Sequence, residues 1–119
     1  MNKLQNIVIK AKTVEKTDEG GEFETWGAPK IFKGVVWSAN GQLQHEQYGD
    51  RLHYIKNLKI DGKYKIRTND AGQVEYIFSN AIIKEGDGVC LYVSKDRNPD
   101  FKIVSIIPHT PLYVEVEKI

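Results

Sequence analysis

The fold of this chain is decided by a turn and the strand that follows it, Asp18-Glu19-Gly20-Gly21-Glu22-Phe23-Glu24-Thr25-Trp26. Gly20 and Gly21 reach the positive φ angles that tight hairpin turns need, because glycine has no Cβ. The aromatic and β-branched residues that follow favour the pleated surface of a strand. Strand patterns lie on both sides, so this stretch predicts the opening hairpin of an all-β domain.

The segment before this turn alternates in polarity with a period of two residues. Ile7, Ile9 and Ala11 share one face, and Lys10 and Lys12 share the other. This pattern predicts a half-buried strand.

The segment after the turn is expected to break and then extend again. Gly27-Ala28-Pro29 predicts an interruption, and Pro29 indicates an edge or a strand end, because proline cannot donate a hydrogen bond to a strand ladder. Residues 31–39 predict a third strand, with Phe32 and Val36 on one face and Ile31, Val35 and Trp37 on the other. Gly34 in its middle indicates a bulge or a sharp coil of the strand, as barrels require.

Residues 40–51 differ from the rest of the chain, because they are polar, rich in glutamine and bounded by glycines. They are predicted to form a long loop that holds a helical turn at most. Loops of this length within a compact domain are often functional, although an ordinary surface excursion is an equal alternative.

Strand patterns return after residue 51 and continue to the end of the chain. Turns are predicted at Asp61-Gly62, at residues 69–72, at residues 85–88, around Pro99 and between Pro108 and Pro111. Side chains expected to face inward are Leu52, Tyr54, Leu58, Ile60, Tyr64, Ile66, Val74, Tyr76, Phe78, Val89, Leu91, Val93, Leu112, Val114 and Val116. Side chains expected to face outward are Lys63, Lys65, Arg67, Tyr113, Glu115 and Glu117. Residues 101–107 are apolar on both faces, which predicts a central strand. Eight or nine short strands with frequent turns indicate one domain over residues 1–119, a small antiparallel β-barrel or sandwich.

Composition agrees with a single small core and a strongly solvated surface. The 119 residues are 40% apolar and 28% charged, with 17 Lys and Arg against 16 Asp and Glu for a net charge of +1. This balance argues against a dedicated duplex-binding protein. No apolar run approaches the ~18 residues of a membrane span, and the first residues lack the uninterrupted apolar core of a signal peptide. No membrane association is therefore expected.

Residues that carry chemistry are sparse. Cys90 is the single cysteine, flanked by Val89 and Leu91, and is expected to be a buried thiol. The acidic turns at residues 18–21 and 85–88 lack the ligand pattern of a calcium loop. The histidines, which lack metal-ligand spacing, are His45, His53 and His109. The sequence predicts no catalytic residue, no metal and no cofactor, and hence a protein that is not an enzyme.

One stretch interleaves aromatic rings with cations, a composition with which small barrels bind unpaired nucleic acid. It comprises Tyr54, Lys56, Lys59, Lys63, Tyr64, Lys65 and Arg67. Tyr64 has the opposite parity to Lys63 and Lys65, so the ring and these cations are expected on different faces. A solvated basic face over a buried tyrosine is favoured, and a single-stranded nucleic-acid-binding barrel is the alternative.

The order of these elements resembles a known family. It comprises the residue 18–21 turn, Thr25-Trp26, Gly34-Val35-Val36, Tyr48-Gly49, Glu85-Gly86-Asp87-Gly88 and Pro99-Asp100-Phe101-Lys102-Ile103, followed by a terminal strand. This order resembles the head-closure, or head-completion (stopper), proteins of tailed bacteriophages, and in particular the versions carried by PBSX-like prophages. Residues 61–81 add hairpin material to the commoner pattern of that family.

The resemblance implies a small β-barrel that assembles as a homo-oligomeric ring beneath the portal or adaptor ring, at the head-tail junction of the virion. It implies assembly in the bacterial cytoplasm, sealing of packaged DNA and a docking surface for tail proteins. The matching channel loop, close to the DNA, is Gln42, Leu43, Gln44, His45, Glu46, Gln47 and Tyr48. Trp37 and Tyr113 are the expected subunit or tail contacts. A tail-completion protein, which joins tail to head, is the sibling alternative.

Overall fold

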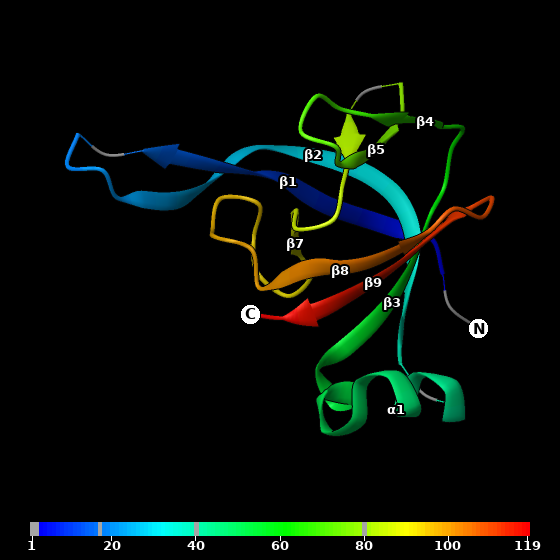
Figure 1. Cartoon of the computed structure of the whole chain (residues 1–119). Coiled ribbons are helices and arrows are strands. Elements are labelled where there is room, and N and C mark those ends of the chain that lie inside the picture. Colours follow the sequence, from blue (N-terminus) through cyan, green and yellow to red (C-terminus); the bar gives the residue numbers. More distant parts are fainter. Residues whose placement is uncertain (1–2, 17, 40, 80) are drawn as a thin grey trace.

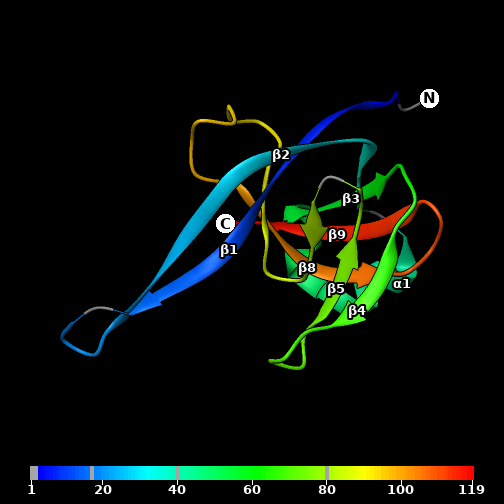
Figure 2. The same ribbon diagram turned by 90° about the horizontal axis from the view of Figure 1, so that it is seen from above.

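The computed structural model of the chain describes residues 3–16, 18–39, 41–79 and 81–119. The elements are β1 (Gln5–Lys16), β2 (Glu22–Ser38), α1 (Gln42–Tyr48), the 3-10 helix η1 (Gly49–Tyr54), β3 (Ile55–Ile60), β4 (Lys65–Thr68), β5 (Val74–Ile77), β6 (Ile82–Ile83), β7 (Gly88–Cys90), β8 (Phe101–Ile107) and β9 (Leu112–Lys118). The strands make a closed barrel and a small separate sheet (Figures 1 and 2). The predicted all-β fold with an antiparallel barrel is confirmed.

The barrel contains six strands in the order β1-β2-β3-β9-β8-β7, and the pairing of β7 with β1 closes it. All neighbouring strands are antiparallel. β8 lies between β7 and β9, so the central position predicted for residues 101–107 is confirmed. Closure leaves the barrel without the two open edges of an ordinary sheet.

Gly34 is the point at which β2 changes partners. It stands opposite Gln5 of β1 and also opposite Ile60 of β3. A Cβ at this position would lie 2.2 Å from the carbonyl oxygen of Lys59. Only glycine allows the backbones to approach so closely, and Figure 1 shows β2 curving from β1 towards β3. The sharp coil predicted at Gly34 is therefore confirmed.

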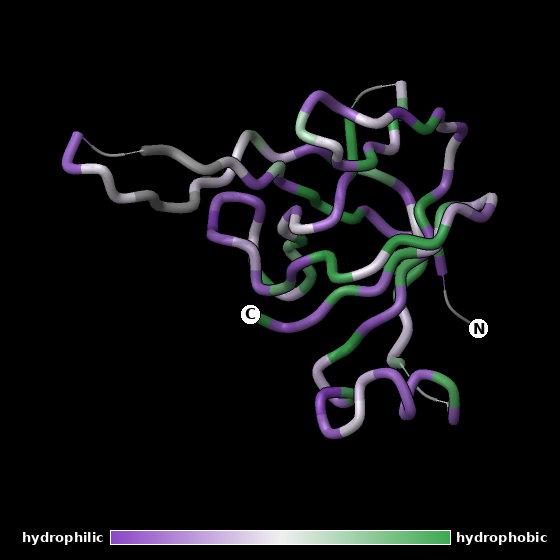
Figure 3. Tube along the Cα trace, in the orientation of Figure 1, coloured by the Kyte–Doolittle hydropathy of each residue, from purple (hydrophilic) through white to green (hydrophobic). Residues whose placement is uncertain are grey.

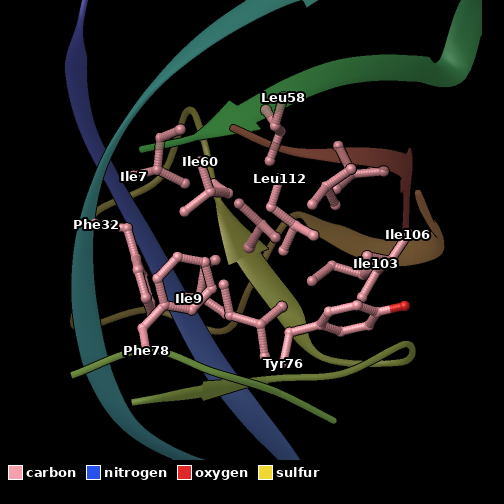
Figure 4. Packing of buried hydrophobic residues seen from close by; sticks show 14 of the residues in the cluster. Ile7, Ile9, Phe32, Leu58, Ile60, Tyr76, Phe78, Ile103, Ile106 and Leu112 are labelled. Atoms are coloured by element: carbon pink, nitrogen blue, oxygen red, sulfur yellow. The ribbon is translucent and has the colours of Figure 1, made fainter. Parts of the chain in front are cut away.

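The small sheet, of order β4-β5-β6, packs against the barrel through aromatic rings. The ring centroids of Phe32 on β2 and Phe78 lie 5.4 Å apart in an edge contact. Phe78, Tyr76 and Ile83 belong to the same buried cluster as the inward residues of the barrel strands (Figure 4). The barrel and the small sheet thus share one hydrophobic core.

The core consists mainly of aliphatic side chains that alternate along the strands. Its fully buried members with no exposed surface are Ile7, Leu58, Ile60, Ile83, Val89, Leu112, Val114 and Val116. Hydrophobic residues follow the barrel strands, whereas the tips of the long turns are hydrophilic (Figure 3). The inward faces predicted for β3 and β9 are confirmed at Leu58, Ile60 and the three β9 residues.

β1 and β2 continue beyond the barrel as a two-stranded ribbon, which we call the β1–β2 arm (residues 12–26). Pairing runs from Lys12 opposite Trp26 to Lys16 opposite Glu22. β7 pairs with β1 only at residues 8–10, so the arm projects from the barrel (Figures 1 and 2). The turn of the opening hairpin is confirmed at residues 18–20, while residue 17 lies outside the described residues.

The interruption predicted at residues 27–29 is wrong, because β2 runs through it without a break. Gly27 and Ala28 together stand opposite Ala11, between the pairs Lys12–Trp26 and Lys10–Pro29. This is a β-bulge, which absorbs the extra residue. β3 pairs with β2 only from Gly34 onwards, so Pro29 pairs with β1 alone and lies at an edge. The edge position predicted as one alternative for Pro29 is confirmed.

Asp61-Gly62 is typical of a hairpin turn, but the strands on its two sides do not pair with each other. β3 lies between β2 and β9, and β4 pairs with β5 within the described part of the chain. The turn instead carries the chain from the barrel to the small sheet. Ile66, predicted to face inward, is 56% exposed, because β4 is an edge strand whose face is left uncovered. Val74 is likewise 41% exposed.

The loop predicted for residues 40–51 is instead largely helical. α1 has 7 residues and passes directly into η1, which reaches Tyr54. Leu52 and Tyr54 are therefore not strand residues, and Asn40 lies outside the described residues. The inward position predicted for Tyr54 is wrong, because Tyr54 ends η1 and is 48% exposed. Gly41 and Gly49 flank α1 with φ values of 98° and 58°, which glycine adopts without strain. In Figure 1, α1 lies on the side of the barrel opposite the small sheet.

Candidate functional site

The outer face of β2, β3 and β9 carries two rows of residues that meet beneath α1. In the first row Trp37 stands opposite Asn57, which stands opposite Glu115. In the second row Lys59 stands opposite Tyr113. Strand alternation places all five side chains on the face that points away from the core.

Asn57 and Glu115 are buried although they face outward, with 2% and 3% of their surface exposed. Gln44 of α1 donates from Nε2 to Asn57 Oδ1 at 2.8 Å and to Glu115 Oε2 at 2.5 Å. The hydroxyl of Tyr48 donates to Glu115 Oε1 at 3.0 Å. Both carboxylate oxygens therefore have a donor, as a buried charge requires.

These polar contacts hold α1 on the barrel, because none of the residues of this fully described helix is buried. Seven residues are too few for a stable isolated helix in water. Burial, and then the hydrogen bond to Glu115, raise the pKa of the Tyr48 phenol well above its ordinary value. Tyr48 thus remains a donor to Glu115 over the whole physiological pH range.

A second link ties η1 to the end of β9. Arg51 donates from Nε and Nη2 to the two carboxylate oxygens of Glu117 at 2.7 and 2.6 Å. This bidentate bond lowers the pKa of the Glu117 carboxyl below its ordinary value. The guanidinium carbon of Arg51 also lies 5.6 Å from the ring centroid of Tyr48.

A hollow of about 500 Å³ lies beside α1, and we call it the helix groove. Its walls include Trp37, Leu43, Gln44, Gln47, Pro111 and Tyr113. The rings of Trp37 and Tyr113 make an edge contact with centroids 5.8 Å apart, and Lys59 Nζ lies 5.6 Å from the Trp37 ring. Leu43 is 79% exposed at the rim. The groove is an aromatic and aliphatic surface open to solvent.

The residues singled out from the sequence are partly brought together here. Leu43, Gln44 and Gln47 line the helix groove with Trp37 and Tyr113, and Tyr48 lies next to it on Glu115. The remaining α1 residues, Gln42, His45 and Glu46, are exposed and are not part of the groove walls. Gln42 donates weakly to Glu46, at 3.4 Å.

Sequence reasoning missed Asn57 and Glu115. It assigned Glu115 to the outer face, which is the correct face, but expected solvent there. The sequence indicates these contacts only through a polar residue on each of two paired strands, together with a glutamine-rich segment whose side chains can form hydrogen bonds with them. Alternation gives the direction of a side chain and does not show what covers it.

The basic stretch between Tyr54 and Arg67 does not form one platform. The Tyr64 ring packs on Phe78 with centroids 5.5 Å apart, and its hydroxyl donates to the His109 carbonyl. Arg67 is paired with Glu75 at 2.7 Å. The inward Tyr64 predicted from parity is confirmed, and the members of the stretch separate onto different surfaces.

Groups that carry chemistry elsewhere are scattered. Among the described residues no cluster of His, Cys, Asp and Glu side chains has a geometry that would hold a metal ion. Cys90 is buried as predicted, and this burial raises the pKa of its thiol. In the described ranges, no helix has the length and apolar character to cross a membrane.

Comparison of the chain with protein family models, with curated proteins and with solved structures found no match.

Proposed function

We propose that this protein is a head-tail connector subunit of a tailed bacteriophage, of the head-closure type. In this role it binds beneath the portal ring as part of a homo-oligomeric ring, retains the packaged DNA and offers a docking surface to the tail. The proposal rests on the family resemblance of the sequence, and a small closed barrel is the fold that this resemblance implies.

The observation that carries the proposal is the presence of two unlike surfaces on one closed barrel. The β1–β2 arm projects from it (Figure 1). The helix groove opens on the β2-β3-β9 face beside α1. A ring of identical subunits needs two different surfaces, because each head-to-tail contact joins one surface to the other. Trp37 and Tyr113 supply the aromatic side chains that are enriched at such interfaces.

The second supporting observation is the way in which α1 is attached. Its residues contribute nothing to the buried core, and Gly41 and Gly49 flank it. Displacement of α1 therefore costs polar contacts and leaves the barrel core intact. A segment of this kind suits the channel position that the resemblance implies for residues 42–48, where polar side chains tolerate DNA phosphates without binding them tightly.

The test is reconstitution with portal rings from the same phage genome, followed by negative-stain electron microscopy. We expect a second ring stacked on the portal ring. Replacing both Trp37 and Tyr113 by Ala should abolish the stacked ring, whereas the control variant Ile66→Ala, an exposed residue on β4, should leave it unchanged. No stacked ring at any protein concentration would remove the basis of the proposal.

A second arm of the test concerns α1. A variant in which a short glycine-serine linker replaces residues 42–48 should keep the barrel and, because the contact residues Trp37 and Tyr113 remain, bind the portal ring. Heads completed with it should lose DNA. DNA retention is measured by nuclease sensitivity of filled heads. Retention equal to that of the unaltered protein would contradict the channel role of this segment.

A further inference from the structure

A second hollow, of about 500 Å³, lies where η1, the start of β3, the β7–β8 loop and the end of β9 meet. Its walls include His53, Tyr54, Lys56, Tyr92, Phe101 and Lys118. We call it the tyrosine hollow. It shares no wall residue with the helix groove.

Two exposed tyrosines stand at this hollow, each supported by another ring. Tyr54 is 48% exposed and its ring centroid lies 3.9 Å from that of His53. Tyr92 is 70% exposed and its ring centroid lies 5.9 Å from that of Phe101, which is buried. Exposed rings backed by other rings are surfaces on which a flat ligand can stack.

The main chain that carries Tyr92 is fixed by Asp100. Asp100 Oδ1 accepts a hydrogen bond from the Leu91 amide at 2.9 Å, and Oδ2 accepts one from the Tyr92 amide at 3.0 Å. The carboxylate, which is also part of the wall, thus bonds the loop with both oxygens. Tyr92 is exposed on a backbone that two hydrogen bonds hold in place, which lowers the entropy that binding would cost.

The charges at the hollow are mainly positive. Lys56 donates to Ser38 Oγ at 2.9 Å, and Lys118 is exposed. The ion pairs among the described residues join Arg51 to Glu117, Arg67 to Glu75 and Lys84 to Asp87, so neither lysine of the hollow takes part in one. Both ammonium groups are available to an anionic ligand.

We propose that the tyrosine hollow binds an unpaired nucleic acid strand, with bases stacked on Tyr54 and Tyr92 and phosphates beside Lys56 and Lys118. Rings combined with cations in a groove are the means by which small barrels bind single strands. Bases inside a duplex are already stacked on their neighbours and do not reach such rings. The site does not depend on the connector function, and each proposal fails or stands by its own experiment.

The experiment is a fluorescence anisotropy titration of the full chain against a labelled oligothymidylate of about 12 nucleotides, within the span of small barrels. At low salt we expect saturable binding, which weakens as salt is added. Tyr92→Ala should weaken it about tenfold, because stacking on one ring is lost. Tyr92→Phe keeps the ring and should bind as the unaltered chain does.

Lysine variants test the phosphate contacts with a matched control. Lys118→Ala should weaken binding and reduce its salt dependence. Lys65→Ala removes the same charge from β4, outside the hollow, and should have little effect. Circular dichroism melts establish that each variant is folded.

Three results would overturn the proposal. One is the absence of binding at low salt. Another is equal affinity of Tyr92→Ala and the unaltered chain, both folded. The third is competition by a duplex or by inorganic polyphosphate as strong as that by unlabelled oligothymidylate, since neither offers unstacked bases.

Discussion

The small sheet and α1 both pack on the barrel, but by opposite means. The small sheet contributes buried rings, and Phe78 and Tyr76 are 7% and 8% exposed within the common core. α1 contributes no buried residue and is held by the side chains of Gln44 and Tyr48 on Asn57 and Glu115. The comparison indicates that the small sheet folds with the barrel, whereas α1 is a separable addition.

The largest effect is expected from breaking the apolar attachment. Phe78→Ala removes a ring that contacts both Phe32 and Tyr64. Loss of a buried phenylalanine costs about 3–5 kcal/mol, which is a large part of the stability of a small domain. We expect a fall of that size in the free energy of unfolding measured with urea, with the small sheet and the barrel unfolding together.

The matched control is Ile82→Ala on β6, a 40% exposed residue of the same sheet. It should lower the free energy of unfolding less than Phe78→Ala does, because Ile82 is 40% exposed whereas Phe78 is 7% exposed. If Phe78→Ala cost less than about 1 kcal/mol, the shared core would not be what joins the sheet to the barrel.

The same contrast explains how much of the molecule the sequence predicts. Leu112, Val114 and Val116 were identified as inward because a barrel strand buries one face, and alternation reports that face directly. Ile66 alternates just as clearly and is exposed, because β4 has no partner layer over that face. Alternation therefore predicts which side chains share a face of a strand. Whether that face is buried depends on segments that are distant in the sequence.

The candidate site shows a further contact that the sequence does not predict. Gln44 and Glu115 are separated by 71 positions, and no local pattern indicates that they meet. Pro29 indicates an edge or a strand end; β2 continues through it, and the edge is what the structure has, because β3 pairs with β2 only from Gly34 onwards. The sequence indicates Trp37 as part of a strand apolar on both faces and Tyr113 as an outward residue of the last strand. Their contact follows from a register that the sequence does not specify.

A smaller and more local effect is expected from breaking the polar attachment. Glu115→Ala leaves Gln44 and Tyr48 without their common acceptor, which typically costs about 1–3 kcal/mol. Because α1 is too short to persist alone, its amides should lose protection in hydrogen exchange. Amides of β3 and β9 should remain protected, since the inward residues of these strands are unchanged.

The control for this variant is Glu115→Gln, which retains an oxygen acceptor in the same place. It should preserve more of the protection of α1 than Glu115→Ala does. Equal loss of protection in α1 and throughout the barrel would contradict the separability of the helix, because it would place α1 within the cooperative core.

The smallest effect on stability is expected from the two exposed ion pairs of arginine, and it depends on pH. Arg51 pairs with Glu117 beside α1, and Arg67 pairs with Glu75 in the small sheet. Arg51 lowers the pKa of Glu117 beside α1, and Arg67 lowers the pKa of Glu75 within the small sheet. A carboxyl whose pKa is lowered by folding stabilises the protein above its ordinary pKa of 4.5. That stabilisation is lost as the pH falls through the lowered value.

Arg51→Ala should therefore lower the melting temperature slightly at neutral pH and have no effect at a pH below the lowered pKa of Glu117. Hydrogen exchange should locate the loss in η1, because the Arg51 bond crosses from η1 to β9. Arg67→Ala should change the melting temperature with the same dependence on pH. Its loss of protection should be confined to the β4–β5 hairpin, since the Arg67 bond joins two directly paired residues. If Arg51→Ala instead had the same effect at acid and at neutral pH, its role would be the packing of its side chain on Tyr48 and not the charge it brings to Glu117.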